Sequence, residues 1–195
     1  MSRSFRTEKE SSIARRRIQH DADGSVVLPR IISRKEYPGD VHPLSRRSLG
    51  RLLRTVPEEY LYGLSRIELR ARESIDIGCP FGMYIGDEKA IFLYSLPLEW
   101  RLPSLSGWLE RSLNEFFAET TTTGKEILVR WPNKNLLSLW FYCEVFAHEL
   151  GHHFRNQYRH KRKRGDLIRE ELVADLHARR FKERLYEEFL RRSAE

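Results

Sequence analysis

Two histidines and a glutamate in the segment HELGH, residues 148–152, are the residues of this chain best suited to chemistry. On an α-helix, residues four apart project from nearly the same face one turn apart, so His148 and His152 can bind one metal ion together. Zinc favours such ligands, and a zinc ion that keeps an open position lowers the pKa of a bound water to about 7. Glu149 lies one step round the helix, where its carboxylate can accept a proton from that water. The spacing therefore predicts a hydrolytic zinc site.

The residues that precede the motif indicate that it lies on a buried helix. The five-residue pattern alone also occurs by chance, above all on solvated helix faces. Here the twelve residues before His148 are apolar apart from Ser138 and Glu144, so we expect a core helix that begins near Leu136. Gly151 costs about 1 kcal/mol relative to alanine inside a helix. We therefore expect Gly151 to lie in close contact with another element or with a substrate backbone. The alternative is that the helix simply tolerates a glycine at this position.

A zinc site of this kind needs a third protein ligand, and the segment REELVADLHARRF, residues 169–181, offers one. Glu171 and Asp175 lie one turn apart on an evident helix, so one carboxylate can bind the metal while the other orients a ligand histidine. Glu170 is the rival ligand. It is less favoured because it is five residues from Asp175 and so turned away from that face.

With both segments the chain resembles the gluzincins, the zinc peptidases that include thermolysin, and more closely the minigluzincins and the ImmA/IrrE-like metallopeptidases. The resemblance rests on HELGH at 148–152 and on the pattern E-x-x-A-D at 171–175, and it covers residues 141–181 well and 60–185 loosely. It implies that zinc is bound by His148, His152 and Glu171. It also implies that Glu149 is the general base and that Asp175 supports a ligand histidine. The metzincin pattern, by contrast, requires Gly and His at positions that hold arginine and tyrosine here.

The resemblance also implies an α+β, zincin-like fold, in which a small mixed sheet packs on the active-site helix and a long C-terminal helix carries the third ligand. In that fold an edge strand flanks the metal and holds a peptide substrate through main-chain hydrogen bonds. Periodicity and turn residues predict a matching order of elements, without indicating which strand lies at the edge. Helices are expected from Ser45, Pro57 and Leu105 and over 167–192, and strands within 25–33, 66–72, 81–86, 89–96 and 126–132.

Several local features of these elements follow from side-chain types. The stretch 97–108 is expected to be an irregular link, and the residues TTTGK, 121–125, are expected to end the helix from Leu105. Asn135 and Asp166 are the expected N-caps of the zinc helix and of the last helix. The helix from Leu105 is expected to bury Trp108, Leu109, Leu113, Phe116 and Phe117, and the last helix has Leu172, Leu176, Phe181, Leu185, Phe189 and Leu190 available for burial.

Length and composition predict one compact domain preceded by a basic arm. The chain has 195 residues, of which 40% are hydrophobic, and this is enough for one core. We expect a partly disordered arm over residues 1–44 and a metallopeptidase domain over 45–195. The longest apolar run is too short to span a membrane, and the first residues lack the apolar stretch of a signal peptide.

The two cysteines, Cys79 and Cys143, are isolated and indicate no disulfide framework, so we expect a cytoplasmic protein. Cys143 is expected to be a small buried residue of the zinc helix. Cys79 is expected to be an ordinary loop cysteine, and a role as a latent metal ligand is the less favoured alternative.

Basic segments suggest a second hypothesis, from a different functional class. The net charge of +7 arises within residues 1–56, which hold 13 Lys and Arg against 6 Asp and Glu, and residues 155–164 form a further basic cluster. Such segments attract nucleic acid or acidic proteins, although simple solvation is the more common explanation. The alternative function is therefore a nucleic-acid-associated regulatory module with a structural zinc. Structural zinc sites, however, normally have four ligands rich in cysteine.

The leading hypothesis is a zinc-dependent endopeptidase that hydrolyses an intracellular protein or peptide, with at most weak nucleic-acid contact. Zn²⁺ is the expected cofactor, and Glu149 is expected to deprotonate the water and pass the proton to the leaving amine. A further donor should stabilise the oxyanion, and His177, Tyr158 and His160 are the polar candidates. Among these, His177 is expected to face away because it lies six residues beyond Glu171. The sequence indicates no oligomeric state.

Overall fold

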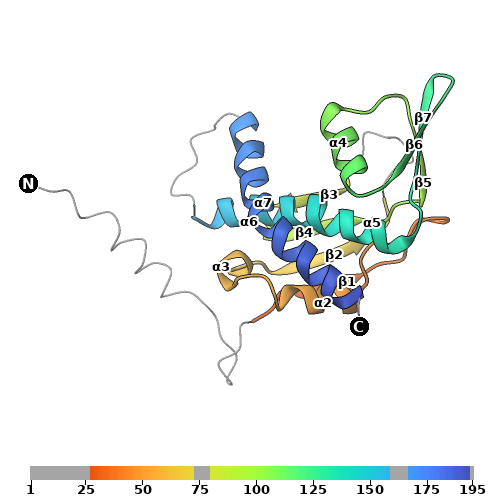
Figure 1. Cartoon of the computed structure of the whole chain (residues 1–195). Helices are drawn as coiled ribbons and strands as arrows, with labels where there is room; N and C mark the ends of the chain where they lie inside the picture. Colours follow the sequence, from red (N-terminus) through yellow and green to blue (C-terminus); the bar gives the residue numbers. More distant parts are fainter. Residues whose placement is uncertain (1–26, 73–79, 159–166, 194–195) are drawn as a thin grey trace, which may run out of the picture.

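The computed structural model describes residues 27–72, 80–158 and 167–193, which form two sheets and a set of helices (Figure 1). The first sheet is mixed. Its strands lie in the order β1, β2, β4, β3, with the first three parallel and β3 antiparallel to β4. Their bounds are Arg30–Ser33 for β1, Arg66–Arg70 for β2, Gly82–Ile85 for β3 and Ala90–Tyr94 for β4. The structure thus confirms the α+β class and the small mixed sheet.

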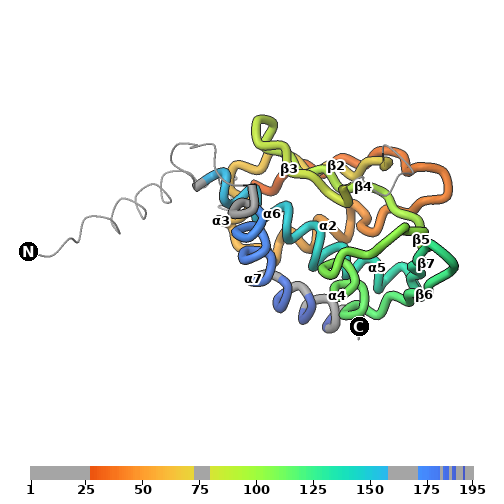
Figure 2. The backbone as a smooth tube through the Cα atoms, turned by 90° about the horizontal axis from the view of Figure 1, so that it is seen from above, coloured from red at the N-terminus to blue at the C-terminus, as the bar shows by residue number. Residues whose placement is uncertain are grey.

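Helices cover one face of this sheet in two layers. The first layer is a run of three consecutive elements: α5 (Lys134–Trp140), the π-helical η1 (Phe141–Phe146) and α6 (Ala147–Tyr158). The second layer is α7 (Leu167–Ser193), which lies against α6 and η1 on the side away from the sheet (Figure 2). The core fills the space between the sheet and the first layer, and its buried side chains include Trp140, Phe141, Phe146, Ile67 and Ile91.

The helix that carries HELGH begins earlier than predicted. Asn133 rather than Asn135 is its N-cap, and the Asn133 side chain accepts a hydrogen bond from the backbone N–H of Leu136 at 3.0 Å. Two asparagines two residues apart offer the same cap chemistry, and the earlier one lets the helix start directly after Pro132. Within η1 the N–H of Ala147 bonds the carbonyl five residues back rather than four. The wider turn rotates HELGH relative to the apolar residues before it.

Backbone contact between α6 and α7 explains the glycine inside HELGH. A Cβ atom on Gly151 would lie 2.5 Å from the carbonyl oxygen of Ala174, so the expected close contact with another element is confirmed. Small residues make this contact, because Ala174 and Ala178 are buried whereas Leu172 and Leu176 are 62% and 52% exposed. The predicted burial of these two leucines is therefore wrong. The side chains of Phe181, Leu185, Phe189 and Leu190 lie outside what the structure describes.

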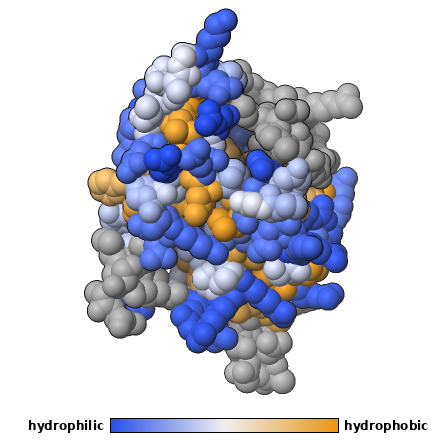
Figure 3. All heavy atoms as spheres, turned by 90° about the vertical axis from the view of Figure 1, so that its right-hand side faces the viewer, coloured by the Kyte–Doolittle hydropathy of each residue, from blue (hydrophilic) through white to orange (hydrophobic). Residues whose placement is uncertain are grey.

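A second sheet, of three antiparallel strands, lies on the right of Figure 1. Its order is β5 (Glu99–Leu102), β7 (Glu126–Arg130), β6 (Glu119–Thr123), and of these strands only β7 was expected. The predicted irregular link contains β5, and TTTGK lies in β6 and the turn after it. Both corrections follow from side chains that favour strands: β-branched threonine in β6 and alternating buried and exposed residues in β5. The face that carries this sheet is hydrophilic over most of its surface (Figure 3).

The helix α4 (Gly107–Glu115) precedes this hairpin, and it buries fewer aromatic side chains than predicted. Leu113 and Phe116 are buried, but Trp108 is 46% exposed and Phe117 is 65% exposed. Phe117 follows the helix with a φ angle of 61°, in the left-handed region, and this directs its side chain away from the buried face. Helical periodicity does not hold beyond the helix end, which explains the incorrect prediction for Phe117; Trp108 lies in the first turn of α4, where its side chain is half exposed.

Two short helices, α2 (Arg46–Leu53) and α3 (Glu58–Leu61), lie where they were predicted. Ser45 caps α2 in a reciprocal arrangement with Ser48. The strand β1 falls within the segment 1–44 predicted as an arm, and its pairing with β2 shows that this part of the segment belongs to the sheet. Residues 1–26 lie outside the described residues. In the part of the chain that the structure describes, no helix is long and apolar enough to cross a membrane.

Candidate metal centre

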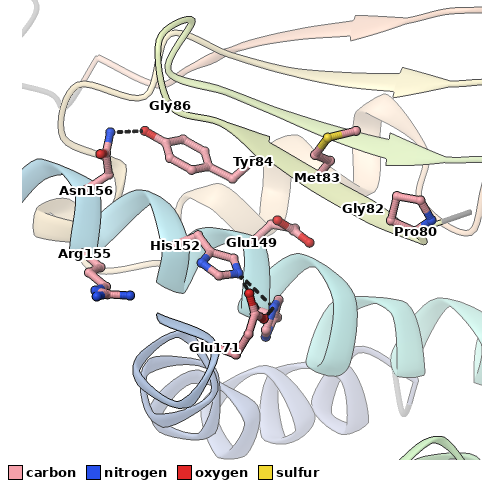
Figure 4. A pocket seen from close by; sticks show the side chains of 11 residues that line it. Pro80, Gly82, Met83, Tyr84, Gly86, Glu149, His152, Arg155, Asn156 and Glu171 are labelled. Carbon is pink, nitrogen blue, oxygen red and sulfur yellow. Dashed lines mark hydrogen bonds and ion pairs between the residues drawn. The ribbon is translucent and has the colours of Figure 1, made fainter. Parts of the chain in front are cut away.

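The three predicted metal ligands meet at one point between α6 and α7. The Nε2 atom of His148 lies 3.0 Å from Nε2 of His152 and 3.2 Å from Oε2 of Glu171. The same Glu171 oxygen is 3.5 Å from Nε2 of His152. Figure 4 shows Glu171 directed from α7 toward His152 on α6. Among the described residues these three form a group that can hold a metal ion.

The distances agree with the geometry of a tetrahedral metal site. Bonds of about 2.0–2.1 Å at tetrahedral angles place neighbouring donor atoms about 3.3 Å apart, which is close to all three separations. Two imidazole nitrogens and one carboxylate oxygen suit a first-row transition metal, whereas calcium and magnesium prefer oxygen ligands. The donor set and its spacing are therefore compatible with a bound metal.

Asp175 lies behind His148, one turn along α7 from Glu171. Its Oδ1 atom is 2.8 Å from the Nδ1 atom of His148. In the neutral imidazole that donates Nδ1–H to this carboxylate, the lone pair is on Nε2 and faces the ligand group. The structure thus brings together all five residues that were predicted to form the site: His148, Glu149, His152, Glu171 and Asp175.

Glu149 is buried beside the ligand group and against β3. Burial raises the pKa of its carboxyl group to about 7, while nearby His148 and a hydrogen bond from the backbone N–H of Tyr84 act in the opposite direction. A Cβ atom on Gly82 would lie 3.0 Å from Cγ of Glu149, so the glycine allows the strand to approach this side chain. A carboxyl group with a pKa near neutrality is suited to accept and return a proton.

Two connected cavities flank the ligand group. The larger, of about 460 Å³, lies between β3 and α6 and extends along the helix to Arg155 and Asn156. The other, of about 330 Å³, shares His148, Glu149 and Glu171 with it and extends the other way. Its further walls come from the apolar Phe81, Trp108 and Val145 and from the acidic Glu144 and Asp175. The metal group therefore lies in the middle of a longer groove.

The rim of this groove is the edge strand β3. The backbone N–H of Tyr94 donates to the carbonyl of Phe81 at 3.0 Å, and the register pairs Gly82 with Leu93. In an antiparallel pair, hydrogen bonding alternates along the strand, so Gly82 and Tyr84 direct their N–H and C=O groups away from β4. The bond from the Tyr84 N–H to Glu149 agrees with this direction. The edge strand beside the ligand group is thus β3.

A network that sequence reasoning missed ties β3 to α6. His153 is fully buried, and its Nε2–H donates to the carbonyl of Tyr62 at 2.9 Å. Its Nδ1 atom can then accept from the hydroxyl of Tyr84 at 3.3 Å, and Asn156 donates to the same hydroxyl at 3.0 Å (Figure 4). Burial lowers the pKa of His153 to about 4, partly offset by its bond to Tyr62. Nothing in the sequence indicates this network apart from a second histidine, His153, directly after the ligand His152.

Other residues singled out from the sequence lie apart from the metal group or outside the described residues. His177 faces away, as expected: its Nδ1 atom is 3.2 Å from the Tyr60 hydroxyl, and its ring packs against Phe154. Cys143 is buried, and burial raises the pKa of its thiol to about 12. Outside the described residues are Cys79, residues 159–166 with His160 and Asp166, and the side chains of Tyr158 and Glu170.

Comparisons with known proteins supply no family for this chain. No protein-family model matches its sequence, and searches of curated proteins and of solved structures find no significant match. The resemblance carried by the two motifs is therefore neither supported nor contradicted by these comparisons, and the function has to be inferred from the site itself.

Proposed function

We propose that the protein is a zinc-dependent endopeptidase with a zincin-like fold. The observation that supports this most strongly is the meeting of His148, His152 and Glu171 within 3.0–3.5 Å of one another. Glu149 is buried next to this group, and a groove bounded by an edge strand runs past it. Ligands, base and substrate groove are the parts that hydrolysis of a peptide bond needs.

Zinc is the metal that this donor set favours. It is commonly bound by histidine and glutamate at tetrahedral sites, and three protein ligands leave a fourth position open for catalysis. When bound, zinc would polarise the scissile carbonyl and make a water molecule more acidic. A structural zinc would need a fourth protein ligand, and the described residues offer a group of three.

The protein's own residues have distinct roles in this proposal. Glu149 accepts a proton from the attacking water and passes it to the leaving amine, and its buried carboxyl group lies beside the ligand group where that water would be held. Asp175 holds His148 in the tautomer that presents Nε2 to the metal. The outward groups of Gly82 and Tyr84 bind the main chain of an extended peptide. The backbone N–H of Tyr84 now donates to the Glu149 carboxylate. When a peptide carbonyl accepts from this N–H instead, the carboxylate would lose that hydrogen bond.

Nucleic-acid binding remains the second hypothesis, but no described feature favours it. Most of the basic cluster at 155–164 and half of the basic segment 1–56 lie outside the described residues. The ligand group, in contrast, opens into a groove rather than being closed by a fourth ligand. The geometry therefore supports catalysis better than a structural metal.

The experiment that tests the proposal is hydrolysis of denatured proteins by the zinc-loaded protein, followed by mass spectrometry of the fragments. Glu149→Gln keeps the shape of the side chain but cannot accept a proton, so we expect it to lose more than about 100-fold in rate. Glu110→Gln, an exposed change on α4, is the matched control and should cleave like the wild type. Equal cleavage by wild type and Glu149→Gln, or none by any zinc-loaded form, would overturn the proposal.

A further inference from the structure

A chain of hydrogen bonds with a fixed direction links the groove to the protein interior. It ends where Nε2 of the fully buried His153 lies 2.9 Å from the carbonyl oxygen of Tyr62. A carbonyl oxygen only accepts, so Nε2 carries the proton of the neutral ring and Nδ1 accepts from the Tyr84 hydroxyl at 3.3 Å. This hydroxyl has then used its one proton. Asn156 therefore has to be the donor in the next bond, from its Nδ2 atom to the Tyr84 hydroxyl at 3.0 Å.

The amide of Asn156 keeps polar groups for a molecule in the groove. Asn156 lies one helical turn beyond the ligand His152 and two turns beyond the base Glu149, so it belongs to the stripe of α6 that carries both. Its side chain is half-buried and lines the larger cavity. Among the described residues its amide makes one hydrogen bond, the one to Tyr84 (Figure 4). One N–H donor and the carbonyl oxygen remain.

The strand β3 determines how an extended peptide approaches this amide. A Cβ atom on Gly82 would lie 2.9 Å from Val145, and Tyr84 reaches His153 further along the helix layer. Gly82 and Tyr84 therefore both face the helices, and β3 runs in the same direction as η1 and α6. A peptide that adds to the edge of β3 away from β4 forms the more stable ladder when it runs antiparallel to the strand. It then runs from the Asn156 end of the groove toward Gly82.

The alternation of side chains along a strand brings one peptide side chain to Asn156. Residues directly opposite each other in a ladder point to the same face, with Cβ atoms about 4.5–5.5 Å apart. The peptide residue opposite Gly82 lies beside Glu149, next to the ligand group. The residue opposite Tyr84 is two positions nearer the N-terminus of the peptide, and its side chain points to the same helix layer. A side chain before the scissile bond thus meets the Asn156 amide.

We propose that Asn156 is a specificity-determining residue that binds a carboxamide side chain, Gln or Asn, on the N-terminal side of the scissile bond. The proposal rests on the peptidase function proposed above and names its substrate class. A carboxamide offers an acceptor for the remaining N–H and a donor for the remaining carbonyl oxygen, whereas a carboxylate only accepts and an ammonium group only donates. A site with such groups discriminates against side chains that leave them unpaired.

Peptides that carry Gln, Glu, Met or Lys, in turn at three positions on each side of the cleaved bond, test the proposal. We expect kcat/KM to favour Gln over Glu and Met by about 10-fold at one N-terminal position, the effect of one or two neutral hydrogen bonds. Asn156→Leu has a similar size without polar groups, so this preference should fall to about 1-fold. Asn156→Asp presents acceptors only and should favour Lys over Gln. Asn114→Leu, the same change at an exposed position of α4, is the control and should keep the wild-type preference.

Binding to the metal-free protein separates this proposal from the proposed function. Fluorescence anisotropy of the labelled peptides should show a tighter Kd for Gln than for Met in the wild type, and no difference in Asn156→Leu. Hydrolysis without a Gln preference, or with one that Asn156→Leu retains, would overturn the role of Asn156 and leave the peptidase intact. A wild-type preference for Glu over Gln would overturn the carboxamide class.

Two further outcomes concern the direction of the peptide and the chemistry. An Asn156-dependent Gln preference on the C-terminal side would overturn the antiparallel direction. Gln-selective binding without any hydrolysis would overturn the peptidase and keep Asn156 as a peptide-binding residue.

Discussion

The hydrogen bond between Nδ1 of His148 and Asp175, at 2.8 Å, determines how this imidazole presents its other nitrogen. Two pairs of residues, each four apart on a helix, are enough to build this arrangement: 148 with 152 and 171 with 175. The spacing within a helix is a local property, which is why the sequence alone could predict these residues as a site. It could not predict the bonds of His153, whose partners Tyr84 and Tyr62 are 69 and 91 residues away.

Replacing Asp175 by Ala should weaken zinc binding by about 10-fold to 100-fold, because the tautomer and orientation of His148 would no longer be held. The fold should be retained, since Asp175 is not part of the core. Competition with a chromogenic chelator measures the affinity, and thermal unfolding of the metal-free protein measures the stability. Glu183→Gln, an exposed change on the same helix, is the control. Unchanged zinc affinity in Asp175→Ala would show that this carboxylate does not support the site.

His153 should make the stability of the metal-free protein depend on pH. Its pKa is about 4 in the folded protein, against an ordinary histidine value of 6.5, so the unfolded chain binds the proton more readily between these values. The contribution is therefore fully present above about pH 6.5 and is lost as the pH falls toward 4. The loss amounts to roughly 3 kcal/mol over that range, at about 1.4 kcal/mol per pKa unit.

Urea unfolding between pH 4 and 7 measures this dependence. His153→Gln removes the titrating group, so its stability should fall less steeply on acidification than that of the wild type. The other histidines remain in both proteins, and their contributions cancel in the comparison. Identical slopes in the two proteins would contradict the burial of a neutral His153.

At the scale of elements, the site depends on how closely β3, α6 and α7 approach one another. Glycine permits both approaches: Gly82 where β3 meets Glu149, and Gly151 where α6 meets Ala174. The order of helices and the β3–β4 hairpin could be predicted from periodicity and turn residues. The strands β5 and β6 were not predicted. Their side chains suit a strand, but such a short pattern does not by itself distinguish a strand from a link, and pairing with β7 decides the structure.

Gly151→Ala should weaken zinc binding by more than about 10-fold and lower the stability. The new Cβ would lie 2.5 Å from a backbone oxygen of Ala174, so α7 would have to move and carry Glu171 and Asp175 with it. Helix propensity alone predicts the opposite, a gain of about 1 kcal/mol for alanine.

Gly50→Ala on α2 is the matched control for this change. Its Cβ would meet only Cδ1 of Ile31, at an ordinary 3.6 Å, so this variant should be as stable as the wild type or more so. Thermal unfolding and a chelator competition assay compare the two variants. A Gly151→Ala protein that gains stability like Gly50→Ala and keeps its zinc affinity would contradict the close helix contact.

At the scale of the whole molecule, the first sheet and the helix layer packed on it place the edge strand β3 beside the face of α6 that carries the ligand histidines. The groove passes between them, with Asn156 at one end and the cavity that Phe81 and Trp108 line at the other. The fold class could be predicted because alternating and helical patterns are local. The position of β3 at the edge could not, since strand order depends on contacts between distant segments such as β1 and β2.

Zinc content of purified variants, measured by elemental analysis, tests the central claim most directly. We predict one zinc per chain in the wild type, and its loss in His148→Ala, His152→Ala and Glu171→Ala. Glu149→Gln should keep the full zinc content, because the base is not a ligand. A Glu171→Ala protein with full zinc, together with loss of zinc from Glu170→Ala, would move the third ligand by one residue. Full zinc in both histidine variants would contradict the metal centre itself.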